Sequence, residues 1–138
     1  MKILMLKGLP ASGKTTFAKE LISTDSTFIR INKDDIRSMI YGKPHSSRSE
    51  SLVLAIRDHI IHEAFSRGQN VIIDDTNFNE RHKRTMLGIA KCYDAEVEEV
   101  FIDTPWEVCV KRDEEREYSV GYKVIKGMYN QYLRPEGD

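Results

Sequence analysis

A glycine-rich segment near the N-terminus constrains the fold of this chain more than any other feature. Residues 8–16 read GLPASGKTT, which fits the phosphate-loop pattern of glycine, four residues, glycine, lysine and threonine. Glycines let successive backbone N–H groups turn toward phosphate oxygens, and a following helix presents its positive N-terminus to the same anion. An apolar run precedes the segment at residues 2–6 and an amphipathic one follows at residues 14–22. This context predicts a strand, a phosphate-binding loop and a helix.

The loop predicts a site for a nucleotide triphosphate with magnesium. Lys14 can reach the β- and γ-phosphates, and the Thr15 hydroxyl can ligate Mg²⁺. We therefore expect ATP and Mg²⁺ as cofactors, with Thr15 as a metal ligand. The residues expected to contact ATP are Gly8, Pro10, Ala11, Ser12, Gly13, Lys14, Thr15 and Thr16.

Apolar periodicity predicts alternating strands and helices along the whole chain. Short apolar or β-branched runs indicate strands, and apolar residues three or four positions apart indicate helices. Strands separated by helices are typical of a parallel sheet covered on both faces, so we expect an α/β fold. The expected strands are 2–6, 27–31, 70–75 and 97–102, and the expected helices are 14–22, one from 33, one through 52–64, 77–93, one from 104, and 122–133.

Three helix starts carry candidate caps. Asn32 precedes the second helix, and Asn77 could form a capping box with Glu80. The sequence TPWE at residues 104–107 supplies a cap at Thr104, a first-turn proline and a third-position acid. Residues 42–50 read as a loop between two helices.

An acid and an arginine lie together where the second strand passes into a helix. Asp34 and Arg37 are three residues apart in NKDDIR and therefore share a helical face. In an α/β sheet the loop after this strand reaches the same carboxyl edge as the phosphate loop. A carboxylate there can take the proton of an attacking hydroxyl, and a guanidinium can hold a phosphate. The plainer interpretation is helix-dipole stabilisation by acids, and Asp35 fits that interpretation better.

Two further acids end the third expected strand. An acid at this position can support Mg²⁺ beside a phosphate loop. Strand alternation places Asp75 on the face of Val71 and Ile73 and places Asp74 on the opposite face. Alternation alone does not select between the two acids.

A pair of arginines occurs in KRDEERE near the C-terminus. Arg112 and Arg116 are four residues apart, so they are expected to share a helix face. Two cations at this spacing repel each other mildly, and an anion between them relieves that repulsion. They could close over a nucleotide, or they could form a solvated face with neighbouring acids.

Composition excludes several other classes of protein. The chain has 138 residues and a net charge of −1, so no global field attracts nucleic acid or a membrane. No apolar run approaches the ~18 residues that a membrane span needs. Cys92 and Cys109 lack metal-type spacing and are expected to be reduced thiols. We expect a single domain over residues 1–138, in a cytoplasmic protein with no membrane partner.

Taken together, these segments resemble the kinase domain of phage-type polynucleotide 5′-hydroxyl kinases. GLPASGKTT is similar to that family's phosphate loop, INKDDIR to its second-strand motif and DTN to the motif after its third strand. DTPWEVCVKRDEER resembles the segment that leads into its lid. The resemblance implies a P-loop kinase fold with strand order 2-3-1-4 and a helical lid.

The resemblance also implies a role for each matching residue. Asp34 would be the general base, Arg37 would bind the acceptor phosphate, and Arg112 and Arg116 would be the lid arginines. Asp75, rather than Asp74, would support the metal. Thr76, in the same motif, would lie near the acceptor together with Asp75.

The sequence therefore predicts an ATP-dependent kinase that phosphorylates the 5′-hydroxyl end of DNA or RNA. Lys14, Arg112 and Arg116 would stabilise charge on the transferred group while Asp34 accepts the hydroxyl proton. Two alternatives remain. One is a kinase of a nucleoside, sugar or metabolite, and the other is a nucleotide-binding switch without transfer activity.

Overall fold

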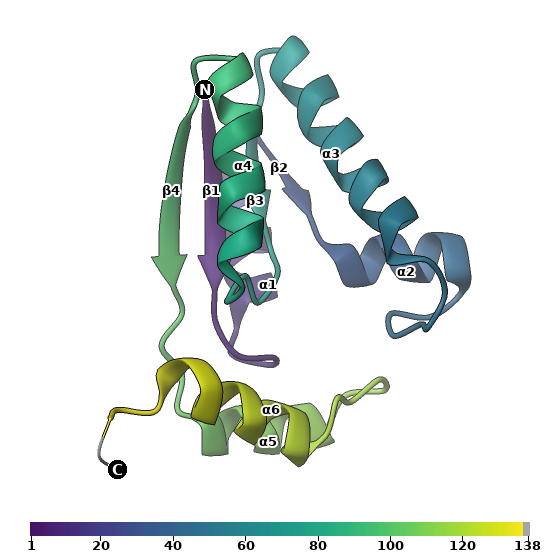
Figure 1. Cartoon of the computed structure of the whole chain (residues 1–138), viewed down its shortest axis with the longest axis vertical. Helices are drawn as coiled ribbons and strands as arrows, with labels where there is room; N and C mark the ends of the chain where they lie inside the picture. Colours follow the sequence, from purple (N-terminus) through teal and green to yellow (C-terminus); the bar gives the residue numbers. More distant parts are fainter. Residues whose placement is uncertain (137–138) are drawn as a thin grey trace.

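A computed structural model describes residues 1–136 and contains a four-stranded parallel sheet. The strands run in the order β2-β3-β1-β4, which confirms the expected 2-3-1-4 arrangement (Figure 1). In register, Leu4 of β1 pairs with Ile72 of β3 and with Glu98 of β4. The strands are β1 (Lys2–Lys7), β2 (Phe28–Ile31), β3 (Asn70–Ile73) and β4 (Glu96–Phe101).

Helices cover both faces of the sheet, and a further helical layer lies beyond the carboxyl ends of its strands (Figure 1). The α3 and α4 helices lie on one face and α1 on the other. The helices are α1 (Lys14–Thr24), α2 (Lys33–Tyr41), α3 (Glu50–Ser66), α4 (Glu80–Cys92), α5 (Trp106–Glu114), α6 (Tyr122–Met128) and the π-helical turn η1 (Tyr129–Leu133). The expected final helix, 122–133, is confirmed in extent, with a π-helical last turn.

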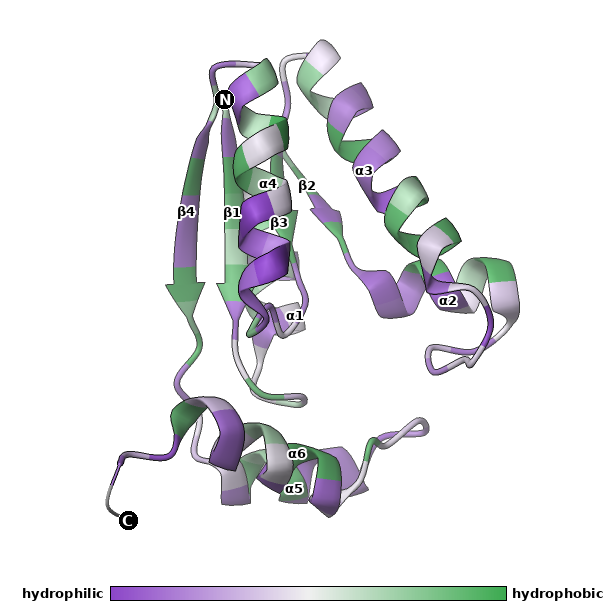
Figure 2. Cartoon of the chain, viewed as in Figure 1, coloured by the Kyte–Doolittle hydropathy of each residue, from purple (hydrophilic) through white to green (hydrophobic). Residues whose placement is uncertain are grey.

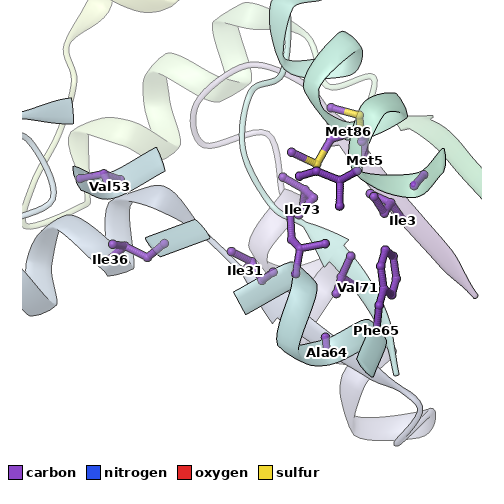
Figure 3. Packing of buried hydrophobic residues seen from close by; sticks show 13 residues of the cluster. Ile3, Met5, Ile31, Ile36, Val53, Ala64, Phe65, Val71, Ile73 and Met86 are labelled. Atoms are coloured by element: carbon purple, nitrogen blue, oxygen red, sulfur yellow. The ribbon is translucent and has the colours of Figure 1, made fainter. Parts of the chain in front are cut away.

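Strand alternation divides the interior into two cores, one on each face of the sheet. Ile3, Met5, Val71 and Ile73 pack against buried side chains of α3 and α4, such as Phe65 (Figure 3). The alternate residues of the same strands pack against α1 on the opposite face, as Leu4, Leu6 and Ile72 show. The central strands are therefore apolar on both sides, as parallel strands between two helical layers must be.

The outer strand β4 differs from the central strands in hydropathy (Figure 2). Three glutamates, Glu96, Glu98 and Glu99, alternate with or adjoin half-buried valines. A third apolar cluster, formed by Leu9, Phe78, Cys109 and Ile125, joins the C-terminal helical layer to the sheet edge.

One of the three predicted helix caps is confirmed. The side chain of Asn32 accepts a hydrogen bond from the N–H of Asp35 at 2.8 Å, which caps α2.

The capping box at Asn77 is wrong, because α4 begins at Glu80 and is capped by Asn79. Asn77 has a left-handed backbone with φ 54°, and its buried amide donates hydrogen bonds to the carbonyls of Leu6, Ile73 and Asp75. Asn77 therefore ties the ends of two central strands together instead of starting a helix.

The cap expected at Thr104 is also wrong. Its hydroxyl donates to the Ser12 carbonyl at 2.7 Å, and the carbonyl of Pro105 accepts from Val108 and Cys109 at the start of α5. Thr104 thus fixes the C-terminal layer against the glycine-rich loop.

Candidate functional site

The carboxyl ends of the strands open into a cleft of about 990 Å³. Its loop side consists of residues 10–16 with Asp74, Arg112 and Arg116, and apolar side chains of the C-terminal layer extend it. Its α2 side consists of Asn32, Lys33, Asp34, Arg37, His45, Asp75 and Thr76. Except for Gly8, every residue to which the sequence gave a binding or catalytic role lines this cleft.

The glycine-rich loop wraps tightly at the start of α1. Gly13 has φ 107° and Ala11 has φ 63°, so two residues of the loop adopt left-handed backbone conformations. A Cβ at Gly8 would lie 2.8 Å from Ser12 Oγ and 3.1 Å from the Ile102 carbonyl. Only glycine at position 8 allows the loop and the end of β4 to approach this closely.

Lys14 lies at the centre of the loop and is almost fully buried. Its ammonium donates to the carbonyls of Gly8 at 3.0 Å and Leu9 at 2.6 Å. Burial lowers the pKa of Lys14 to about 8. The ammonium is therefore held by neutral carbonyl dipoles of its own loop, which an anionic ligand can replace.

Asp74 connects the loop to the sheet. Its Oδ2 accepts hydrogen bonds from the Thr15 hydroxyl at 2.9 Å and from Arg30 Nε at 2.7 Å. Its Oδ1 is buried and has no hydrogen-bond partner within residues 1–136. Arg30 also forms an ion pair with Asp35 at 2.6 Å. Because Arg30 contacts both acids, it holds the Asp74 carboxylate in position.

The hydroxyl expected to bind the metal thus donates to Asp74 and not to Asp75. The reason is strand alternation, because Asp74 follows Ile72 on the face that packs against α1, where Thr15 lies. The assignment of the metal to Asp75, which the resemblance implied, stays a prediction. A hydroxyl beside a carboxylate with an orphaned oxygen fits a divalent cation that takes its other ligands from phosphates and water. Within the described residues, no group of three or more protein ligands could hold a metal alone.

Asp75 lies on the α2 side and is buried. Its Oδ1 accepts the backbone N–H of Lys33 at 3.1 Å, and its Oδ2 has no hydrogen-bond partner within residues 1–136. Burial raises the pKa of Asp75 to about 7, although the nearby charge of Lys33 opposes that shift.

Asp34 and Arg37 lie together as the sequence predicts. Arg37 Nη1 donates to Asp34 Oδ1 at 2.6 Å. The same guanidinium forms a bidentate pair with Glu50 at 3.0 and 2.6 Å. These hydrogen bonds from Arg37 hold the pKa of the Glu50 carboxyl below its usual range. Sequence reasoning missed Glu50, which was placed in a loop but is the first residue of α3. An acid one residue after a serine was the available signal for a helix start.

Arg112 and Arg116 both line the cleft, but they do not share a helix face as expected. Arg112 lies on α5 and its Nη1 donates to the Ser12 carbonyl at 3.4 Å, whereas α5 ends at Glu114, before Arg116. The buried carboxylate of Asp113 accepts hydrogen bonds from Arg116 and from the backbone N–H groups of Val120 and Gly121. Asp113 therefore turns the chain back after α5 and fixes Arg116 beyond the helix end.

The parallel sheet, the glycine-rich loop and the cleft define a P-loop nucleotide-binding protein with a kinase-type fold. Residues 3–135 match the AAA domain family. The chain therefore belongs to that family.

Two curated relatives match almost the whole chain. An L-seryl-tRNA(Sec) kinase from Methanococcus maripaludis is 30% identical over 141 residues, which cover 96% of this chain and 53% of that protein. A putative bifunctional polynucleotide kinase/RNA ligase from Autographa californica nuclear polyhedrosis virus is 23% identical and covers 96% of this chain and 21% of its own length. The chain thus spans about half or less of the curated relatives that it matches.

A solved structure, that of the Pnkp1/Rnl/Hen1 RNA repair complex, contains a chain similar to this one. The similarity covers 95% of this chain and 43% of that chain, with 31% identity and a TM-score of 0.80. One similar protein is thus named as a putative polynucleotide kinase/RNA ligase, and the similar solved chain belongs to an RNA repair complex. Among residues 1–136, no helix has the length and apolar character to cross a membrane.

Proposed function

We propose that this chain transfers the γ-phosphate of ATP to the 5′-hydroxyl end of a polynucleotide, DNA or RNA. The observation that carries the proposal is one cleft with a phosphate loop on one side and the Asp34–Arg37 pair on the other. A phosphate loop alone gives no reason for such a pair. A base and a phosphate-binding guanidinium are what a hydroxyl acceptor with an adjacent phosphodiester requires.

In the proposed reaction, ATP binds on residues 8–16 with its γ-phosphate toward the α2 side. Asp34 accepts the proton of the 5′-hydroxyl while the hydroxyl oxygen bonds to the γ-phosphorus. The bond from that phosphorus to the β,γ-bridging oxygen breaks, and ADP leaves. Lys14, Arg112 and Arg116 stabilise the charge on the transferred group, for which positioning and electrostatics supply most of the catalysis.

Magnesium would be held by Thr15 together with Asp74 and would neutralise phosphate charge during transfer. We propose Asp74 in place of Asp75 because Asp74 is the acid that contacts the Thr15 hydroxyl. Arg37 would bind the phosphate that follows the first nucleoside, and Thr76 would lie beside it.

A second candidate acceptor is the hydroxyl of an aminoacyl group on tRNA. The 30% identity to an L-seryl-tRNA(Sec) kinase over 96% of this chain supports it. That acceptor also needs a base on the α2 side, but its hydroxyl belongs to an amino acid and not to a polynucleotide end.

Label transfer from γ-labelled ATP separates these candidates. The acceptors are 5′-hydroxyl RNA and DNA oligonucleotides, seryl-tRNA, a free nucleoside and a sugar, each with wild type and Lys14→Ala. We expect label on the oligonucleotides with wild type only. Label on seryl-tRNA alone would establish the second candidate. Label on the nucleoside or sugar alone would establish a small-molecule kinase, and no transfer with intact ATP binding would indicate a nucleotide switch.

A further inference from the structure

The α2 side of the cleft contains a lysine that the proposed mechanism does not yet use. Lys33 is the first residue of α2 and precedes Asp34 directly. Its backbone N–H donates to Asp75, but within residues 1–136 its ammonium forms no hydrogen bond and no ion pair. Within the described part of the chain, every other lysine or arginine that lines the cleft already has a hydrogen-bond partner, as for Lys14, Arg37, Arg112 and Arg116.

The charges around Arg37 indicate what the ammonium of Lys33 could bind. Arg37, the guanidinium expected to receive the acceptor phosphate, faces two carboxylates, Asp34 and Glu50, each at 2.6 Å. An anionic acceptor that approaches this arrangement meets more negative than positive charge. A polyanion therefore needs a further cation on this side, because like charges disfavour association.

The surroundings of Lys33 also favour an anionic ligand. Arg57 of α3 is almost fully buried, and its Nη1 lies 3.4 Å from His82 Nδ1 on α4. Burial, followed by the charges of Lys33 and Arg57, lowers the pKa of His82 to about 4, and burial lowers the pKa of Lys33 itself. Lys33 and Arg57 thus share one partly buried region. Arg57 is paired with Asp58 at 2.9 Å, whereas the ammonium of Lys33, which lines the cleft, is unpaired within residues 1–136.

We infer that Lys33 binds the acceptor's first internucleotide phosphate together with Arg37, and so selects an anionic polynucleotide end. This inference rests on the proposed function. With Lys33, the acceptor phosphate would have a cation that is not already paired with a carboxylate within the described residues. The competing explanation is structural, namely that Lys33 serves only to neutralise buried Asp75, toward which its charge acts.

A pair of acceptors that differ in one charge tests the inference. One is a short 5′-hydroxyl oligonucleotide, and the other carries an uncharged methylphosphonate at its first internucleotide linkage. Label transfer is measured with wild type, Lys33→Gln, Lys33→Met and Lys33→Arg. Lys19→Gln is the matched control, because Lys19 is exposed on α1 and does not line the cleft.

We expect Lys33→Gln and Lys33→Met to lower kcat/KM for the phosphodiester acceptor by roughly 10- to 100-fold, since each loses one hydrogen bond to a charged group. With the methylphosphonate acceptor the loss should be under about threefold, and KM for ATP should not change. The salt dependence of kcat/KM for the phosphodiester acceptor should weaken by about 0.7 to 1 in log–log slope. Lys33→Arg should restore most of the activity, and Lys19→Gln should match wild type.

Three results would overturn the inference while the kinase proposal stands. They are equal losses with both acceptors, an unchanged salt slope in the Lys33 variants, and a wild type that uses both acceptors equally well. The first would assign Lys33 to neutralising Asp75. If the wild type labels neither acceptor, the proposed function fails and the inference fails with it.

Discussion

The two sides of the cleft differ in what their cations contact before any ligand binds. On the loop side, Lys14 and Arg112 donate to backbone carbonyls, which are neutral, although Arg116 pairs with the carboxylate of Asp113. On the α2 side, Arg37 is paired with the carboxylates of Asp34 and Glu50. Phosphates of ATP would therefore replace weak neutral contacts, whereas an acceptor phosphate must compete with charged ones.

Under the proposed function, ATP and the acceptor would therefore be selected in different ways. The loop side would, under that function, bind the phosphates of a nucleoside triphosphate without displacing many charged contacts. The α2 side would bind only an acceptor whose charge offsets the loss of its existing ion pairs. We therefore expect the identity of the acceptor to be set by residues of α2 and by the first turn of α3.

Among substitutions that change how the acceptor binds, the largest expected effect comes from Arg37→Ala. It removes the clamp and leaves Asp34 and Glu50 facing the acceptor unpaired. We expect kcat/KM for a 5′-hydroxyl oligonucleotide to fall by an amount equivalent to about 2–4 kcal/mol, with ATP affinity almost unchanged. Steady-state label transfer and ATP titration measure the two quantities. Arg67→Ala is a matched control, because Arg67 forms an ion pair with Glu63 outside the cleft. Loss of ATP affinity with normal acceptor use would show that Arg37 binds ATP and not the acceptor.

The sequence predicted the loop side well because its determinants are local. Glycine spacing, strand alternation and a following helix all act within a few residues, and alternation correctly placed Asp74 and Asp75 on opposite faces. Neither the partner of Thr15 nor the role of Asn77 could be predicted in this way. Both depend on contacts between segments that are distant in the sequence.

Sequence reasoning also missed two basic residues, Arg30 and Lys33. Arg30 lies in the otherwise apolar strand FIRI, and its pairing opposite Ile72 places it on the same face as Asp74. That lone charge was a usable signal. Lys33 gave no comparable signal, because its proposed role is inferred from the pairing of the other lysine and arginine side chains that line the cleft within residues 1–136.

A second prediction concerns the two acids at the end of β3. Asp74 is held by Thr15 and Arg30, whereas Asp75 is buried with one orphaned oxygen and a pKa of about 7, well above its ordinary value. Between about pH 4 and about pH 7, Asp75 in the folded state therefore keeps a proton that Asp75 in the unfolded chain has lost. Its contribution to stability is present at low pH and is lost as pH rises from about 4 to about 7.

Asp75→Asn should remove this pH dependence. We expect the free energy of unfolding of the variant to exceed that of wild type by roughly 1–3 kcal/mol at pH 8, with a smaller difference at pH 5. The Asn side-chain carbonyl can still accept the Lys33 N–H. Urea unfolding at several pH values measures the difference. A difference that stays constant from pH 5 to pH 8 would contradict the assigned protonation of Asp75.

The smallest effect should come from Glu50→Gln, which tests whether Glu50 and the acceptor phosphate compete for Arg37. If the acceptor phosphate competes with Glu50 for Arg37, neutralising Glu50 should lower KM for the acceptor by about two- to fivefold, as expected for a partly exposed ion pair. KM for ATP should not change. Glu63→Gln is the control, since it weakens an ion pair at the other end of α3. A raised acceptor KM would instead show that Glu50 positions Arg37 for binding.

The most direct test of the account is the behaviour of Asp34→Asn, because Asp34 connects the α2 side to chemistry on the loop side. ATP affinity, measured by calorimetry, and single-turnover transfer to a 5′-hydroxyl oligonucleotide are determined on the same preparation. We predict ATP affinity within a few-fold of wild type and a transfer rate lower by about 10² to 10⁴-fold, as for loss of a general base. Transfer at a near-normal rate by the purified variant would contradict the assignment of Asp34 as the base on which the proposed reaction depends.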